Sequence, residues 1–276
     1  MAIGLALFAA LVYGAADFFG GLASRKTAPE VVVVLAQIAG LGLLAVTAFA
    51  LPNRFYASDV GWGIAAGCGG AVGIGALYAA LAVGRMGVVS PITAVVGASV
   101  PVIVGLALGE RPTVLAMSGV ALAFLAVALV ASSAQTWRIS FDEPGLGLAL
   151  LSGVSIGALY VFLARAHHDG GLTLLATTRL TSIVLLFAFA VIRRRSLRPA
   201  SGTIAAIVVA GVLDMLANVL YVYATHAGML AVVAVLTSLY PASTVILARI
   251  VLKERLAPTQ WVGVALATAG VVLIAR

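Results

Sequence analysis

The chain has 276 residues, of which 63% are hydrophobic and 9% charged, and its formal net charge is +7. A soluble domain carries about 25% charged residues, so this composition excludes an ordinary water-soluble domain. The basic residues lie in short segments between apolar runs, which indicates membrane topology and lipid contact rather than nucleic-acid binding. The single cysteine, Cys68, excludes a disulfide within one chain.

Long apolar runs follow one another along the chain. Runs of about 20 residues have the length that a helix needs to cross roughly 30 Å of hydrocarbon. A helix satisfies its own backbone hydrogen bonds, so we predict an all-α, polytopic transmembrane helical bundle. The ten predicted spans are 3–22, 32–51, 60–83, 88–108, 113–132, 146–166, 172–192, 203–225, 231–251 and 258–275.

The two halves of the chain resemble each other. A shift of 143 residues places Gly4–Leu7 on Gly147–Leu150, and one inserted residue later Gly109–Arg111 falls on Lys253–Arg255. With five spans per half, the second half must insert upside down relative to the first, which is the inverted-repeat architecture of many secondary transporters. We predict a first repeat at 1–132, a connecting loop at 133–145 and a second repeat at 146–276.

Two segments resemble the EamA domain: Gly97 to Arg111 followed by Gly119, and Pro241 to Arg255 followed by Gly263. Two such domains in tandem are typical of ten-helix members of the drug/metabolite transporter superfamily. The resemblance implies an exporter of amino acids, metabolites or drugs, driven by proton or exchange gradients. It also implies a bacterial inner (plasma) membrane protein with both termini in the cytoplasm.

The distribution of basic residues argues for the opposite orientation. The loops on the side away from the termini hold more Lys and Arg, including Arg193–Arg195, than the loops on the terminal side. Basic loops face the cytoplasm, so this pattern places the termini outside. We follow the resemblance and expect cytoplasmic termini, with the two indications in conflict.

Ionisable residues within apolar spans are costly and therefore mark functional sites. Asp214 lies in the middle of the eighth span, with Asn218 and Tyr221 following on the same face. Because burial favours the protonated form of a carboxyl group, Asp214 is a candidate proton carrier, and Asp17 in the first span is the alternative carrier. The alternative is a structural ion pair between Asp214 and Arg179.

Three further residues are candidates for substrate binding. Asp17 lies in the first span, and its repeat counterpart is Tyr160, so the halves differ in polarity there. Gln37 and Arg179 lie at similar depths in opposite halves. Arg179 could bind a substrate carboxylate, since a guanidinium group suits bidentate recognition.

Prolines in the fourth and ninth spans predict kinks that expose backbone carbonyl groups to a cavity. Hydroxyl groups lie close to these prolines. Among them, we select Thr93 and Tyr240 as candidate cavity-lining residues.

Enzymatic chemistry is not expected. Gly153–Gly157 matches the G-x-S-x-G nucleophile motif, but it lies within an apolar span rather than at a strand-to-helix turn. His167–Asp169 is interpreted as a solvated loop, because neighbouring histidines point in different directions. We predict no catalytic residue, no metal site and no cofactor.

The sequence thus predicts a secondary active transporter that moves small molecules by alternating access, with lipid and protons as further partners. The alternatives are a passive channel, a lipid scramblase and, less favoured, a membrane-embedded lipid-modifying enzyme. Substrate identity, transport direction, coupling ion and oligomeric state are left open by the sequence.

Overall fold

A computed structural model describes residues 1–50, 54–84, 86–131, 144–167, 171–194, 196–252 and 258–275. All regular structure in these residues is helical, which confirms the all-α prediction. The helices are α1 (Ala2–Ser24), α2 (Pro29–Ala50), α3 (Ala57–Val83), α4 (Met86–Ala107), α5 (Val114–Ala131), α6 (Leu146–Leu163), α7 (Leu172–Ile192), α8 (Ile204–Ala227), α9 (Leu230–Thr237), α10 (Tyr240–Leu252) and α11 (Pro258–Ala275).

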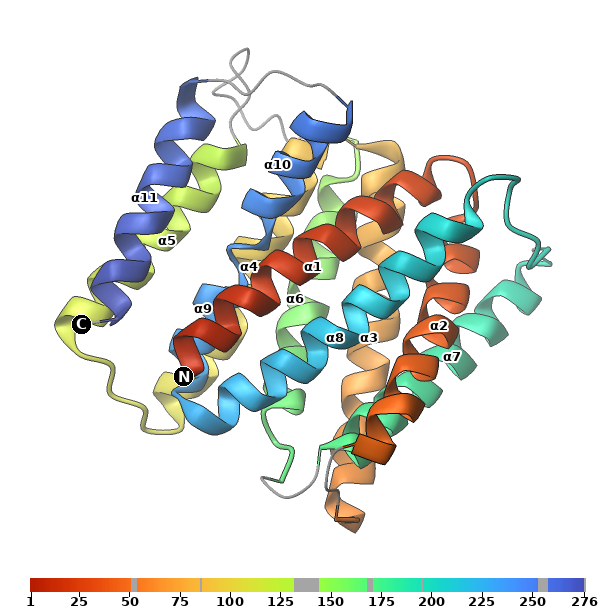
Figure 1. The fold of residues 1–276 in the computed structure, drawn as a ribbon, viewed down its shortest axis with the longest axis horizontal. Helices are drawn as coiled ribbons and strands as arrows, with labels where there is room; N and C mark the ends of the chain where they lie inside the picture. Colours follow the sequence, from red (N-terminus) through yellow and green to blue (C-terminus); the bar gives the residue numbers. More distant parts are fainter. Residues whose placement is uncertain are drawn as a thin grey trace.

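The helices form an up-and-down bundle, with both chain termini toward the same end (Figure 1). Within the described residues, six helices are long and apolar enough to cross a membrane, namely α1, α2, α3, α6, α7 and α8. The outer surface is also apolar: α7 exposes Val184, Phe187, Phe189 and Val191. Such a surface suits contact with lipid rather than water, which supports an integral, multi-pass membrane protein.

The predicted ninth span is divided. Helix α9 ends at Thr237, and α10 begins at Tyr240, immediately before Pro241. Proline has no backbone N–H and its ring clashes with the preceding turn, so the helix ends there. The fourth predicted span is not divided: α4 runs without interruption from Met86 to Ala107 through Pro91 and Pro101. Eleven helices in the described residues therefore occupy the positions of the ten predicted spans.

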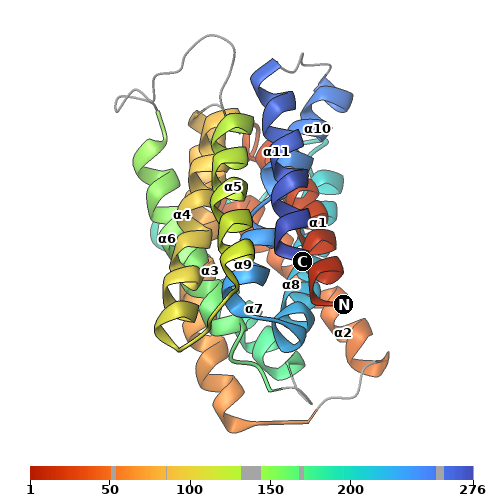
Figure 2. The same ribbon diagram turned by 90° about the vertical axis from the view of Figure 1, so that its left-hand side faces the viewer.

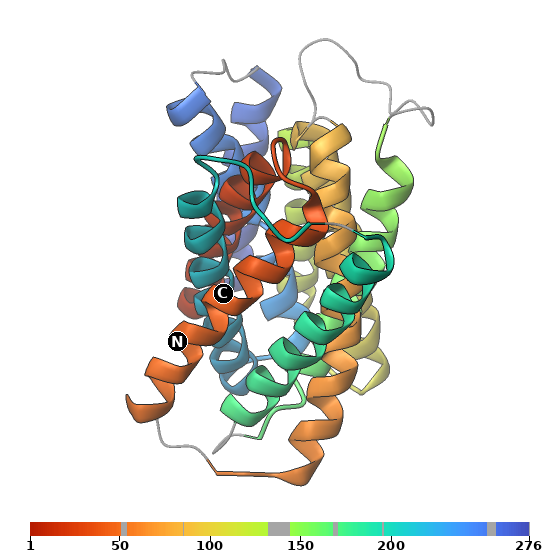
Figure 3. The ribbon, with the colours of Figure 1, turned by 90° about the vertical axis from the view of Figure 1, so that its right-hand side faces the viewer.

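Helices from the first half pack mainly on helices from the second half. Helix α1 lies against α8, α3 against α6, and α2 against α7. Figure 2 shows α5 beside α11 at one side of the bundle, and Figure 3 shows α2 and α7 at the other. Contacts between the two halves of the chain thus outweigh contacts within either half among the described helices.

Small residues permit close helix packing. A Cβ atom on Gly63 would lie 2.7 Å from the Leu174 carbonyl oxygen, and one on Gly67 would lie 2.7 Å from the Thr178 carbonyl oxygen. Both glycines lie on α3, four residues apart, and both face α7. Small-residue faces let helix backbones approach in a membrane, where lipid supplies no hydrophobic drive between helices.

Candidate functional site

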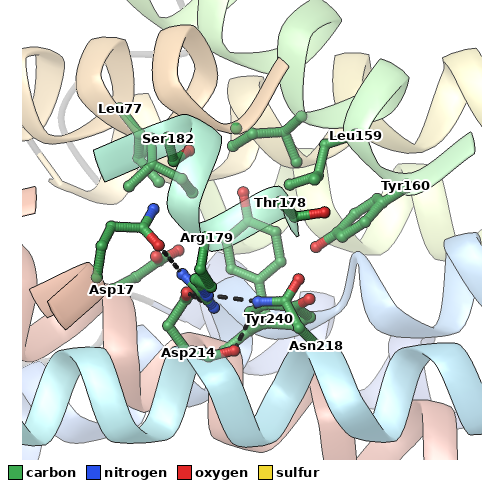
Figure 4. Close-up of a pocket in the computed structure, with 15 residues that line it drawn as sticks. Asp17, Leu77, Leu159, Tyr160, Thr178, Arg179, Ser182, Asp214, Asn218 and Tyr240 are labelled. Atoms are coloured by element: carbon green, nitrogen blue, oxygen red, sulfur yellow. Dashed lines mark hydrogen bonds and ion pairs between the residues drawn. The ribbon is translucent and has the colours of Figure 1, made fainter. Parts of the chain in front are cut away.

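A pocket lies between the two halves at the centre of the bundle (Figure 4). The space inside it that a water-sized sphere can occupy is about 30 Å³, so the side chains nearly fill the pocket in this conformation. The residues that line it come from α1, α2, α3, α6, α7, α8 and α10. They are Tyr13, Asp17, Gln37, Gly70, Ile74, Leu77, Ile156, Leu159, Tyr160, Thr178, Arg179, Ser182, Asp214, Asn218 and Tyr240.

Arg179 on α7 joins two helices from opposite halves. Its Nη1 atom donates to Oε1 of Gln37 on α2, and its Nη2 atom lies 2.5 Å from Oδ2 of Asp214 on α8. The amide nitrogen of Asn218 donates to the Asp214 backbone carbonyl at 2.7 Å and approaches Oδ2 of Asp214 at 3.4 Å. The Arg179 side chain is 6% exposed and that of Asp214 is 15% exposed, so this ion pair is largely shielded from water. Figure 4 shows the two side chains together with Asn218. The predicted Asp214–Arg179 ion pair is therefore formed.

Asp17 is the second carboxylate of the pocket, and its situation differs from that of Asp214. The residue is 8% exposed and faces the pocket from α1. The residues that the structure describes make no hydrogen bond or salt bridge to its carboxylate, and the charge that acts on it is that of Asp214, which has the same sign. A buried carboxylate without a partner is costly, so Asp17 is poised to take a proton or a cation.

Three tyrosines form the aromatic part of the pocket wall. The rings of Tyr13 and Tyr160 are 5.9 Å apart and tilted by 55°. Tyr240, at the start of α10, points its hydroxyl toward the Ser90 carbonyl oxygen at 3.4 Å. Figure 4 shows Asp17 and Tyr160 on opposite sides of the pocket, with the Tyr240 ring between them. Each ring has an electron-rich face, which favours positive charge nearby.

Close contacts between helix backbones position the side chains that line the pocket. A Cβ atom on Gly211 of α8 would collide with the Ala36 carbonyl oxygen of α2, so the two backbones meet at this point. Gln37 and Asp214 follow the crossing directly and are thereby brought to the same guanidinium group. On the other side, a Cβ atom on Gly14 would collide with the Tyr240 carbonyl oxygen, which fixes α1 against the start of α10.

Six of the eight predicted binding residues line this pocket: Asp17, Gln37, Arg179, Asp214, Asn218 and Tyr240. Tyr221 lies behind the wall instead. Its ring stacks on Tyr160 at 4.6 Å, and its hydroxyl donates to the Tyr160 carbonyl oxygen at 3.3 Å. Thr93 is also elsewhere, donating to the Ala149 carbonyl oxygen at 3.2 Å on the α4–α6 contact.

Sequence reasoning did not select Tyr13 and Tyr160 for binding. A signal for each was present. Tyr13 precedes Asp17 by four residues and so shares its helix face. Tyr160 is the repeat counterpart of Asp17, and the structure places the two counterparts on opposite sides of one pocket. Thr178 and Ser182 also line the pocket, although their hydroxyls donate to the Leu174 and Gly67 carbonyl oxygens.

No group of three potential metal ligands occurs among the residues that the structure describes. Of the His167–Asp169 segment, only His167 lies within them, and its Nδ1 is 2.7 Å from Oδ1 of the buried Asp59. The Gly153–Gly157 motif lies within α6, so Ser155 has no strand-to-helix turn that would present it as a nucleophile. Glu254 and Arg255 lie outside the described residues.

Residues 143–276 match the model of the EamA-like transporter family. A solved structure described as "Crystal structure of protein" shares 17% sequence identity with the chain, with a TM-score of 0.72, and the alignment covers 96% of this chain and 95% of that chain. At this identity the likeness shows the fold alone. No curated protein matches the chain. The second half of the chain is thus similar to an EamA-like transporter domain.

Proposed function

We propose that the protein is a secondary transporter that carries small molecules through the central pocket by alternating access. The observation that carries this proposal is the pocket itself, whose ionisable lining is supplied by both halves. Asp17 and Gln37 come from the first half, and Arg179 and Asp214 come from the second. Charged groups deep in a helical bundle mark the path of a substrate or a coupling ion.

The halves that would move are residues 1–132 and 146–276. In inverted-repeat transporters, the binding site lies between the repeats near the middle of the membrane, and one repeat rocks against the other. The cross-half pairing of α1 with α8 and of α3 with α6 supports this division. Export across a bacterial inner membrane is part of the same proposal.

Proton coupling is assigned to Asp17. Asp214 is neutralised by Arg179 at 2.5 Å, so its charge has a fixed partner. Asp17 has none among the described residues and faces the same pocket. A carboxylate that alternately binds a proton and another ligand cannot be held in a permanent ion pair.

The proposal is tested in proteoliposomes containing the purified protein and a labelled mixture of metabolites, with and without an imposed pH gradient. We expect one or more solutes to accumulate above the level in empty liposomes, and the gradient to increase the accumulation. Asp17→Asn should remove the effect of the gradient. If Asp17→Asn responds to the gradient as the unmodified protein does, Asp17 is not the proton carrier.

The same preparation separates a carrier from a channel. Solute on the far side accelerates uptake by a carrier, because the loaded pocket returns faster than the empty one. A passive channel shows neither this acceleration nor accumulation against a gradient. Flux that is unsaturable and unaffected by internal solute would therefore contradict the proposal.

A further inference from the structure

We propose that the central pocket binds a small organic cation, an aromatic or aliphatic amine without a carboxylate, whose ammonium group pairs with Asp17. This inference rests on the proposed transport function and names the substrate class of the same site. It is carried by the charges of the pocket, the hydrogen bonds already formed within it and the position of its tyrosines.

The first argument is the charge of the lining. Of the side chains that line the pocket, Asp17 and Asp214 are acids and Arg179 is a base. Arg179 pairs with Asp214, so one negative charge on Asp17 has no counterion among the described residues. In a low-dielectric interior, this charge attracts a cation and repels an anion.

The second argument concerns the basic group. A substrate carboxylate would need the guanidinium group of Arg179, but this group already donates to Gln37 through Nη1 and forms an ion pair with Asp214 through Nη2. Binding an anion would require breaking this buried ion pair, which leaves Asp214 without compensation. The pocket is therefore unsuited to the carboxylate of an amino acid, although it suits the ammonium group.

The third argument is the aromatic wall. Tyr160 and Tyr240 line the same pocket as Asp17, and Figure 4 shows the Tyr240 ring between Asp17 and Tyr160. Tyr13 precedes Asp17 by one helical turn, and its ring packs against Tyr160. A cation that pairs with Asp17 would thus lie in a pocket whose wall includes three tyrosine rings, and aromatic faces attract ammonium groups. Leu77, Ile156 and Leu159 supply an apolar surface for the remainder of the ligand.

This arrangement couples the cation to the proton. Asp17 can hold either a proton or an ammonium group, but not both. When the cation binds to protonated Asp17, the carboxyl proton leaves to the water and the carboxylate pairs with the ammonium. One positive charge thus enters the pocket as one leaves, which is the requirement for exchange of an amine for a proton.

The test is equilibrium binding to the purified full-length protein in lipid nanodiscs at pH 7, measured by titration calorimetry. Four probes share a phenyl ring: phenethylamine is a cation, 2-phenylethanol is neutral, phenylacetate is an anion and L-phenylalanine carries both charges. We expect phenethylamine to bind at least about tenfold more tightly than each of the other three, since a charge-assisted contact adds this much affinity.

Variants at two buried carboxylates test whether Asp17 is the source of the preference for the amine. In Asp17→Asn, phenethylamine should bind no more tightly than 2-phenylethanol, whereas Asp17→Glu should retain the preference for the amine. Asp59→Asn is the matched control, because it removes another fully buried carboxylate, one that pairs with His167 at the start of α3. It should keep the preference of the unmodified protein.

Similar affinities for the four probes, or tightest binding of phenylacetate or L-phenylalanine, would overturn the proposal. The ranking of the four affinities is measured on the unmodified protein, so it tests the proposed substrate class even if a variant fails to fold. A gradient-driven flux of some other solute, with no binding of phenethylamine, would refute the substrate class and leave the transport function intact. Binding of phenethylamine without any flux would instead refute the transport function.

Discussion

Arg179 joins α2, α7 and α8 because its guanidinium group presents donors in two directions. One contacts Gln37 and the other contacts Asp214, and all three side chains are largely buried. Removal of one member of a buried ion pair leaves the other charge without compensation, which costs more than the pair contributes when intact. The bridge therefore stabilises the bundle and also leaves Asp17 as the free charge of the pocket.

Arg179→Gln should lower the free energy of unfolding by about 3–5 kcal/mol, because Asp214 keeps a buried charge without a partner. Adding Asp214→Asn to this variant should recover part of the loss. Thermal unfolding of the detergent-purified variants measures both effects. Arg111→Gln, which alters an exposed arginine, is the control and should change stability by no more than about 0.5 kcal/mol. Equal stability of the single and double variants at Arg179 and Asp214 would contradict the argument.

Tyr221 shows, at the scale of a residue, that helical spacing alone does not decide whether a side chain faces the pocket. It follows Asp214 by seven positions and was therefore predicted to share its polar face. In the structure Asp214 and Asn218 face the pocket, whereas Tyr221 stacks on the back of Tyr160. Seven residues are only about 20° short of two helical turns, so Tyr221 leaves the pocket because it lies about 10 Å further along the axis of α8, where it meets Tyr160.

At the scale of the element, the crossing of α2 and α8 determines where Gln37 and Asp214 meet. The backbones touch at Ala36 and Gly211, and a Cβ atom on Gly40 would lie 2.8 Å from the Gly211 carbonyl oxygen. No side chain larger than hydrogen fits at Gly211 without separating the helices. Gly211 is thus required for Gln37 and Asp214 to reach the same Arg179 side chain.

Gly211→Ala should destabilise the protein by about 1–3 kcal/mol, because the added methyl group forces the helices apart. Gly42→Ala is the matched control on α2, since nothing lies within 4 Å of the position that its Cβ would take. It should leave stability unchanged or raise it by about 0.5–1 kcal/mol through helix propensity. Melting temperatures of the two variants compare them directly, and equal shifts would show that the crossing is not tight.

The short helix α9 depends on a carboxylate from the other half. Glu110, in the connection between α4 and α5, accepts hydrogen bonds from the backbone nitrogens of Leu230 at 2.7 Å and Ala231 at 2.9 Å. These N–H groups belong to the first turn of α9 and have no partner within that helix. The charge also complements the positive end of the helix dipole. Glu110 in the first half thus caps a helix of the second half.

Glu110→Ala should lower stability by about 1–2 kcal/mol, as expected for loss of a helix cap. Glu110→Gln retains one acceptor oxygen and should have an intermediate effect. Thermal unfolding of both variants provides the measurement. An unchanged melting temperature for Glu110→Ala would indicate that water replaces the carboxylate without cost.

At the scale of the whole molecule, neither half provides its own core. Helices α1 and α3 pack most extensively on α8 and α6, and α5 packs on α11. Each of these contacts joins the first half to the second. The pocket follows from the same arrangement, because its lining is shared between the halves.

We therefore expect residues 1–132 or 146–276, expressed alone, to be degraded or to aggregate, and the two fragments expressed together to form a monodisperse complex. Size-exclusion chromatography and resistance to protease in detergent measure the outcome. If one fragment alone gave a monodisperse, protease-resistant monomer, the interdependence of the halves would be refuted.

Much of this architecture was predictable. The apolar runs predict the helices within a few residues, because a helix that crosses lipid must satisfy its own backbone and must have a certain length. The cost of charge in lipid also identified Asp17, Arg179 and Asp214 as residues of one site. Tyr13 and Tyr160 were not selected, because tyrosine is common in helices and its spacing alone does not indicate a binding role.

The sequence by itself determined a helical membrane bundle with ionisable groups within its apolar spans, and it predicts two similar halves. The physical reason is that length, apolarity and charge act locally along the chain. Only the tertiary structure decided that Arg179 neutralises Asp214 and leaves Asp17 unpaired among the described residues. That choice depends on distances between helices, which are set by close approaches such as Gly211 on Ala36 and not by the spacing of residues within any one helix.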